Sequence, residues 1–196
     1  REALRTIPRE KVTILTKLWW RYDGDPKEVP ADFKVRSAKM AIQRFRHELA
    51  TDYIDIVLMH CLTTPAWTEE MKPYMEALAE AKERKQIRAV GVSCHTLGAV
   101  KTAATLPWVD VVLARINPKG AKMDAPTDQV VPVLREIKRN GKAIIGMKIY
   151  GEGTLANMKE ECIRFAQTEG LIDTMTVGGE TPEQMNETLN LVAKYP

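Results

Sequence analysis

Residues 53–60, YIDIVLMH, decide the fold, because they form a nearly unbroken apolar run that ends on an imidazole. A strand that is buried on both faces has a sequence of this kind, and such strands belong to parallel sheets covered by helices. In a βα barrel the chemistry takes place at the carboxyl ends of the strands. His60 is therefore the first candidate site residue.

A second run of the same type, VTILTK (residues 12–17), ends on Lys17. Alternation along a strand places Lys17 on the same side as Leu15. A lysine at this point either extends its ammonium to solvent or is held in a site. Because two successive strands end on ionisable residues, Lys17 and His60 together indicate a site more strongly than either does alone.

The remaining chain alternates between apolar strands and amphipathic helices. Apolar residues recur at steps of three and four over 32–49, which predicts a helix with His47 on its solvated face. Thr68 is predicted to cap the next helix, and Thr181-Pro182 to open the last one. The predicted strands cover residues 12–20, 53–60, 87–93, 109–116, 143–149 and 172–177, and the other predicted helices cover 96–106, 128–139 and 158–167.

This alternation, with no Asn-Gly hairpin between two strands, predicts an α/β fold with a parallel sheet and right-handed crossovers. Six strand–helix units can form either an open doubly wound sheet or most of a barrel, and the pattern leaves both open. The 196 residues suit one domain but are fewer than the roughly 250 typical of a complete eightfold barrel. The chain begins at Arg1 rather than Met, so a leader and preceding structure are left open.

The composition gives no sign of nucleic-acid, membrane or metal binding. The net charge is +3, and Lys and Arg are scattered among Asp and Glu. The three cysteines, Cys61, Cys94 and Cys162, have neither zinc-ligand nor CxxC spacing, and Cys162 is expected to be buried in a helix. We expect a reduced, cytoplasmic compartment.

Five motifs in order resemble the aldo-keto reductase family: ILTK (14–17), TDYIDIVLMH (51–60), IRAVGVSCH (87–95), IIGMKIYGEG (144–153) and TVGGETPEQMNETL (176–189). The resemblance covers nearly the whole chain. It implies an eight-stranded barrel of the TIM type, of which this chain would hold about six units as one N-terminally incomplete domain. It also implies reduction of a small aldehyde or ketone with NADPH, or with NADH as the alternative, in an oligomeric state that is left open.

The resemblance makes Lys17 and His60 catalytic, and places the accompanying Asp and Tyr on a strand before Arg1. An ammonium beside a phenol, whose ordinary pKa is about 10, favours its anion and makes it a usable acid. His60 would donate a hydrogen bond to the carbonyl oxygen and stabilise the charge that develops there.

Cofactor residues are implied in two groups. At the nicotinamide end, Ser93 would bond the carboxamide, Cys94 stands where the family has Asn, and Leu113 stands where a Gln often lies. Met147 replaces a stacking aromatic residue, and Lys148 extends either to phosphate or to solvent. The remaining positions are Gly151 and Gly153 for the pyrophosphate, Gly178 and Gly179 for the 2'-phosphate loop, Gln184 in place of an Arg, and Glu187 near the adenine. Without Lys or Arg in that loop, the preference for NADPH over NADH is weakened.

Trp19 and Cys61 follow the two key strand endings, where they either line the substrate pocket or simply pack; for Trp20 packing is favoured. A zinc or Cys-His site at Cys94 and His95 is disfavoured, because adjacent strand residues point apart. Two other functions are kept as alternatives. One is a nucleotide-binding regulatory subunit with little or no catalysis; the other is an unrelated βα barrel that uses Lys17 for Schiff-base chemistry.

Overall fold

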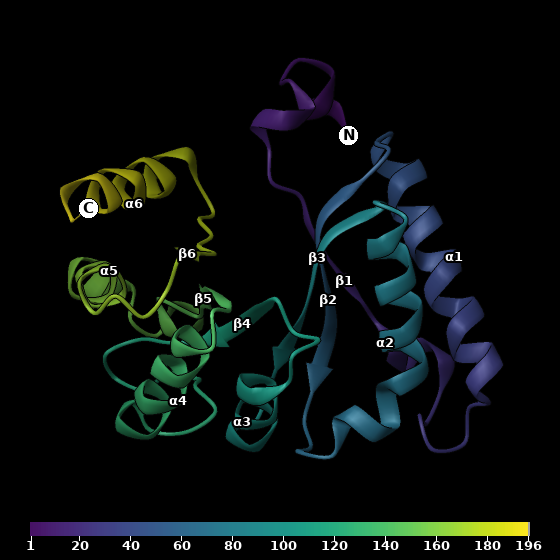
Figure 1. Ribbon diagram of the computed structural model, residues 1–196. Helices are drawn as coiled ribbons and strands as arrows, with labels where there is room; N and C mark the ends of the chain where they lie inside the picture. The colour runs from purple at the N-terminus through teal and green to yellow at the C-terminus, as the bar shows by residue number, and fades with distance from the viewer. Residues whose placement is uncertain (196) are drawn as a thin grey trace.

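Six strands form one parallel sheet, in which they lie side by side in the same order as along the chain (Figure 1). The computed structural model describes residues 1–195. A doubly wound sheet reverses its strand order at a switch point, whereas sequential order is that of a βα barrel. The order therefore favours the barrel type, as predicted. The strands are β1 (Leu15–Leu18), β2 (Ile54–Leu62), β3 (Ile87–Cys94), β4 (Val111–Arg115), β5 (Ala143–Met147) and β6 (Thr174–Met175).

The helices cover only one face of this sheet. All six contribute side chains to the large hydrophobic core or pack against it, and none contributes to the small cluster on the other face. In Figure 1, α1 and α2 lie on the right, outside β1 to β3, and α5 and α6 lie on the left, outside β5 and β6. The helices are α1 (Ala31–Leu49), α2 (Trp67–Glu83), α3 (Leu97–Thr105), α4 (Thr127–Arg139), α5 (Lys159–Thr168) and α6 (Pro182–Lys194), and the 3-10 turns are η1 (Glu2–Arg5), η2 (Arg9–Lys11), η3 (Trp20–Asp23), η4 (Gly151–Gly153) and η5 (Ala156–Met158).

The face without helices is the inner face of the barrel-type sheet. Its cluster consists of Leu58, Val111, Leu113, Ile145 and Met147, supplied by alternate positions of β2, β4 and β5. On β3 the position facing this cluster is a glycine. A Cβ on that residue would lie 2.0 Å from the carbonyl oxygen of β4 and 2.9 Å from the β2 leucine, so no side chain fits at Gly91.

The predicted elements are confirmed in number and order, but the strands at the edges are shorter than predicted. β1 pairs only with β2 and β6 only with β5, so each ends where its one partner ladder ends. Thr181 caps α6 as predicted, since its hydroxyl accepts the Gln184 N–H. The prediction for Thr68 is wrong, because α2 already begins at Trp67 and its N-cap is Ala66.

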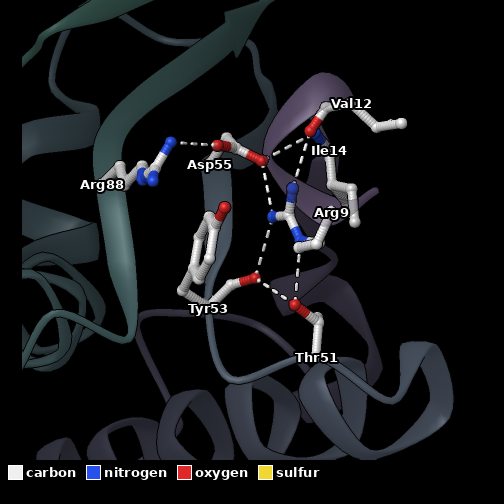
Figure 2. Close-up of polar contacts among 7 residues, drawn as sticks. All are labelled: Arg9, Val12, Ile14, Thr51, Tyr53, Asp55 and Arg88. Atoms are coloured by element: carbon white, nitrogen blue, oxygen red, sulfur yellow. Dashed lines mark hydrogen bonds and ion pairs between the residues drawn. The ribbon is translucent and has the colours of Figure 1, made fainter. Parts of the chain in front are cut away.

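A buried carboxylate joins the N-terminal ends of β1, β2 and β3 (Figure 2). Asp55, 10% exposed, pairs with Arg9 at 2.6 Å and with Arg88 at 3.1 Å. Its Oδ2 also accepts the backbone N–H of Ile14 at 2.9 Å, just before β1 begins. The Tyr53 ring lies between the two guanidinium groups, 4.0 Å and 4.1 Å from their carbons. These contacts fix how β1 lies against β2.

The same device recurs at the starts of β4 and β6. Asp110 accepts the N–H of Val90 at 2.9 Å, and Asp173 accepts the N–H of Ile144 at 2.7 Å. Each carboxylate also pairs with a lysine of an earlier helix, Lys82 in α2 and Lys138 in α4. We call Asp55, Asp110 and Asp173 the strand staples, since each holds one strand to the strand before it.

We expect Asp55→Asn to lower the free energy of unfolding by about 3 kcal/mol, because it leaves the mostly buried Arg9 guanidinium without its counter-charge. Urea unfolding followed by circular dichroism measures the change. Asp52→Asn is the matched control, since Asp52 is exposed three residues earlier. A loss below about 0.5 kcal/mol, as for ordinary surface substitutions, would show that Asp55 does not hold the strands together.

Candidate active site

Lys17 and His60 lie side by side at the carboxyl ends of adjacent strands. Lys17 is in register with Leu58 across the parallel β1–β2 pair. His60 follows Leu58 by two residues, so alternation returns it to the same inner face of the sheet. The two ionisable groups that the sequence singled out are therefore neighbours, as the hypothesis requires.

Aromatic rings surround the His60 imidazole. The Trp19 ring lies 4.7 Å from it between centroids, tilted by 46°, and the His95 ring lies 5.6 Å from it, edge to face. Trp20 is buried and donates its indole N–H to the His60 carbonyl at 2.7 Å, which fixes the backbone there. Trp19 thus lies against the catalytic candidate, as pocket lining requires, whereas Trp20 packs.

Burial, helped by nearby positive charge, keeps the His60 imidazole neutral. Burial is the main cause, followed by the charges of Lys17 and Arg21, and together they lower the pKa of His60 to about 4. The pKa of Lys17 is also lowered, first by burial and then by the Lys148 ammonium. At neutral pH, His60 can therefore act as an N–H donor without carrying a charge.

His95, Arg115 and Asp124 form a second polar cluster that contacts the first. An Nη2 of Arg115 lies 2.6 Å from Nδ1 of His95, and its Nη1 lies 3.2 Å from Oδ1 of Asp124. The Asp124 side chain is 4% exposed. From the sequence, His95 suggested only metal or nucleophile chemistry and Arg115 was not predicted as a site residue, although Arg115 is a charged residue at the end of a buried strand, like Lys17.

A cavity of about 930 Å³ opens on the inner face and extends from β1 to the start of α6. Its wall combines apolar side chains, two lysines near β1 and β5, and a glycine loop before α6. The predicted site residues on this wall are Lys17, Met147, Lys148, Gly153, Gly178, Gly179 and Gln184. Leu113, which stands where the family often has a Gln, also lines the wall.

Other predicted residues lie beside the cavity or away from it. Ser93 is completely buried beneath His95, Cys61 adopts a φ of +62° directly after His60, and Gly151 is buried with φ +55°. The Glu187 carboxylate pairs with Lys159. Cys94 points away, into the outer core at 0% exposure, so its thiol lies on neither the cavity wall nor the face of the sheet that Ser93 occupies. Burial raises the pKa of that thiol.

The resemblance implies that the adenosine part of the nucleotide binds beside the loop before α6. This region contains one cation that was not predicted from the sequence. Lys159, from the first turn of α5, lies on the cavity wall close to the loop before α6. Glu180 lies on the same wall, and Glu187 pairs with Lys159. Lys159 is distant in sequence from this loop, so only the packing of α5 against α6 reveals it.

Residues 1–195 contain neither a candidate metal site nor a candidate membrane-spanning helix. No group of three or more His, Cys, Asp or Glu side chains is arranged to hold a metal ion. In the same range, no helix has both the length and the apolar character needed to cross a bilayer.

Strand order and site together define a βα-barrel scaffold, with a lysine and a histidine meeting at one rim. The profile of the Aldo/keto reductase family matches residues 1–195, and the chain belongs to that family. The predicted family is thus confirmed, and the interpretation as an unrelated Schiff-base barrel is wrong.

Relatives of established name match only part of their own length. Methylglyoxal reductase DkgB of Salmonella typhi is 30% identical over 104 residues, which are 53% of this chain and 35% of that protein. The NADH-specific methylglyoxal reductase of Escherichia coli is 22% identical over 143 residues, 69% of this chain and 43% of the relative. The chain therefore spans less than half of either relative.

Solved structures agree on the fold. A Pseudomonas aeruginosa protein assigned to the aldo-keto reductases superposes with a TM-score of 0.77 at 20% identity, over 99% of this chain and 70% of that one. The holo form of a Bacillus halodurans aldo-keto reductase gives a TM-score of 0.70 at 16% identity, over 97% and 69%.

Because His60 and His95 both have pKa values of about 4 in the folded chain, below the usual 6.5, the unfolded chain binds protons first as the pH falls. We expect the free energy of unfolding to decrease from pH 6.5 towards 4, and urea unfolding at several pH values measures this slope. His60→Gln should flatten the slope between pH 6.5 and 5. The control is His47→Gln, on the exposed face of α1; equal slopes in the two variants would contradict the assignment.

Proposed function

We propose that this chain supplies the catalytic lysine and histidine and the nucleotide cavity of a reductase that converts a small aldehyde or ketone to an alcohol with NADH or NADPH. The observation that carries the proposal is that Lys17 lies on the wall of a cavity of about 930 Å³ and beside His60 of the adjacent strand, close enough for its charge to lower the pKa of His60. The names of the methylglyoxal reductases and the family membership support it.

The cavity wall fits a nicotinamide nucleotide. The volume of the cavity is at the upper end of the range for ordinary ligand sites. Leu113 and Met147 present apolar surface for a flat ring. A Cβ at Gly153 or Gly178 would meet no atom within 4 Å, which leaves room for a ligand against the backbone. Lys17 and Lys148 provide positive charge on the same wall. When bound, the nucleotide supplies the hydride.

The residues of this chain would act on the carbonyl oxygen. Neutral His60 donates its N–H to that oxygen and orients the carbonyl, and this donor becomes more effective as negative charge develops there. Lys17, which is partly buried, would lower the pKa of a phenol beside it and so ease proton transfer to the oxygen. The resemblance places that phenol before Arg1.

We expect Lys17→Met to reduce turnover of methylglyoxal by at least about 100-fold, the usual contribution of a residue that assists proton transfer, while the Kd for NADH changes little. Loss of NADH absorbance measures turnover and tryptophan quenching measures binding. Lys11→Met, at an exposed lysine ahead of β1, is the control. Full activity of the Lys17 variant would remove this residue from the mechanism.

Charges near α6 support NADH as the preferred cofactor, rather than the NADPH that the family resemblance first indicated. The single cation Lys159 is already paired with Glu187, and Glu180 adds an unmatched negative charge to the wall. A 2'-phosphate would therefore enter a region of net negative charge. The NADH-specific name of the Escherichia coli relative agrees with this proposal.

We expect Glu180→Gln to tighten NADPH binding about threefold while leaving NADH almost unchanged, because an exposed charge contributes up to about 1 kcal/mol. Fluorescence titration with both nucleotides measures the ratio of Kd values. Glu183→Gln is the control, since Glu183 is exposed in the first turn of α6, three residues after Glu180, but does not line the cavity. Equal ratios in both variants would contradict the charge argument.

A nucleotide-binding regulatory subunit is the second candidate. Two observations favour it: Leu113 offers no hydrogen bond to a carboxamide, and the Cys94 thiol points into the outer core. Nucleotide binding without turnover of any aldehyde would support this function over the reductase.

A further inference from the structure

The turn that follows β1 brings an aromatic ring and a positive charge to His60. η3 (Trp20–Asp23) begins directly after Trp19, whose ring lies 4.7 Å from the His60 ring between centroids. The guanidinium carbon of Arg21 lies 5.8 Å from the Trp19 ring, and the charge of Arg21 acts on His60. The surroundings of His60 on this side therefore depend on where η3 lies.

The η3 turn is too short to hold its own position. It has four residues, and the hydrogen bonds donated by the Tyr22 and Gly24 N–H groups at its end both measure 3.4 Å. This length is beyond the ordinary range for N–H···O bonds, and 3-10 segments have poor hydrogen-bond geometry. The start of the turn is attached by the Trp20 indole N–H, which donates to the His60 carbonyl. The other end needs a separate attachment.

Asp23, the last residue of η3, provides this second attachment. Its Oδ1 accepts the Ser37 hydroxyl of α1 at 2.8 Å, and its Oδ2 accepts the Tyr74 hydroxyl of α2 at 2.7 Å. Hydrogen bonds to a carboxylate are stronger than those between neutral groups. The end of the turn is thereby tied to two helices on the outer face of the sheet.

The Tyr74 hydroxyl is the buried half of this attachment. Tyr74 is 1% exposed, and the other buried residues of α2 are apolar. A buried hydroxyl is costly to leave without a partner, so the contact with Asp23 resists being broken. Burial raises the pKa of Tyr74 and the hydrogen bond to Asp23 raises it further. The phenol therefore stays protonated and donates over the usual pH range.

Lys34 holds a later part of the same loop. It is 6% exposed, and its ammonium donates to the carbonyl of Pro26 and, at 3.2 Å, to the carbonyl of Glu70 in α2. Neither of these partners belongs to η3. The position of the turn itself therefore depends on Asp23.

We propose that Asp23 is a positioning residue for His60: by fixing η3 on α1 and α2, it holds Trp19 against the imidazole. Asp23 contacts neither cofactor nor substrate in this scheme and acts only through the backbone of the turn. The effect on turnover rests on the proposed function, because it takes His60 to be the donor to the carbonyl oxygen.

The titration of His60 reports on this arrangement. Burial, to which the Trp19 ring contributes, is the largest cause of the low pKa of His60, and the charges of Lys17 on β1 and Arg21 on η3 follow. His95, after β3, lies edge to face against the same ring. Release of η3 would expose the imidazole and move Arg21 away, so the pKa of His60 would rise towards its ordinary value.

The test removes the attachment from either side in the 196-residue chain. Ser37→Ala combined with Tyr74→Phe deletes both donors and leaves the sequence of the loop unchanged. Asp23→Ala removes the acceptor instead. Glu28→Ala is the matched control for this second variant, since it removes an exposed carboxylate from the same loop.

Two measurements on the nucleotide-free chain follow the attachment directly. Nuclear Overhauser effects between ring protons at pH 7 report the contact between Trp19 and His60. Imidazole NMR spectra across pH give the pKa of His60, with exposed His47 as internal reference. Circular dichroism at each pH shows whether the chain is folded, and turnover of methylglyoxal and the Kd for NADH are measured in parallel.

We expect the wild-type chain and the control to show the ring contact and to titrate His60 near pH 4. In the double variant and in Asp23→Ala the contact should be lost and the titration should move towards pH 6.5. Turnover should fall about 10- to 100-fold, the usual cost of a misplaced catalytic group. The Kd for NADH should stay the same, because the described residues 19–30 do not line the cavity.

Three results would overturn the proposal. The first is a folded double variant that keeps the ring contact and titrates His60 near pH 4. The second is an equal change in the Glu28→Ala control. The third is loss of the ring contact with full turnover, because His60 would then need no positioning by Asp23.

Failure of the proposed function gives a different result. If the wild-type chain neither binds NADH or NADPH nor reduces methylglyoxal, the proposed function is wrong, and the predicted effect on turnover falls with it. The ring contact and the His60 titration are recorded without nucleotide or substrate and still decide whether Asp23 holds Trp19 against His60.

Discussion

The buried Asp55 carboxylate is the interaction on which the arrangement of the site depends. It holds the start of β1 through the Ile14 N–H and Arg9, and it reaches β3 through Arg88. A one-residue slip of a strand moves every side chain to the opposite face. Fixing β1 against β2 at one end therefore ensures that Lys17 and His60 share a face at the other end. The carboxyl ends remain free for chemistry while the amino ends carry the stabilising contacts, the division expected of βα barrels.

Electrostatics divides the inner rim into groups with different tasks. Lys17 and Lys148 place ammonium groups on the cavity wall, whereas His60 and His95 are kept neutral first by burial and then by the cations around them. An imidazolium in this position would repel both lysines, while a neutral ring can donate without adding charge. The site thus combines fixed positive charge with uncharged donors, an arrangement that suits an anionic nucleotide and a polarised carbonyl.

Much of this fold followed from the sequence because local patterns decide it. Buried parallel strands are apolar runs, so the ionisable residue at the end of such a run is visible; Lys17 and His60 were found in this way. Ser93 and Cys94 show the limit of the method. Both are adjacent in a motif shared with the family, yet alternation turns one inward and the other into the core. The family resemblance assigns both residues to the cofactor site. Only the alternation of side chains along β3 shows that they lie on opposite faces of the sheet.

The rest of the site could not be found locally because it depends on packing between distant segments. Asp124 reaches Arg115 from the loop after β4, and Lys159 reaches the cavity from a helix well before the glycine loop it faces. The shortened edge strands have a similar cause, since hydrogen bonding to a single partner limits their length. Neither effect leaves a periodic pattern in the sequence.

The strand staples also divide the chain into separable pieces. Asp55, Asp110 and Asp173 each bridge a strand to the one before it, which groups the sheet as β1 with β2, β3 with β4, and β5 with β6. A break in the backbone within the connection from β2 to β3 would leave the Ile14 and Arg9 contacts of Asp55 inside one fragment. A break between β1 and β2 would place Asp55 on one fragment and Ile14 and Arg9 on the other. The first pair of fragments is therefore better suited to reassemble after being expressed apart, which makes the region around α2 a natural place to cut this protein for complementation.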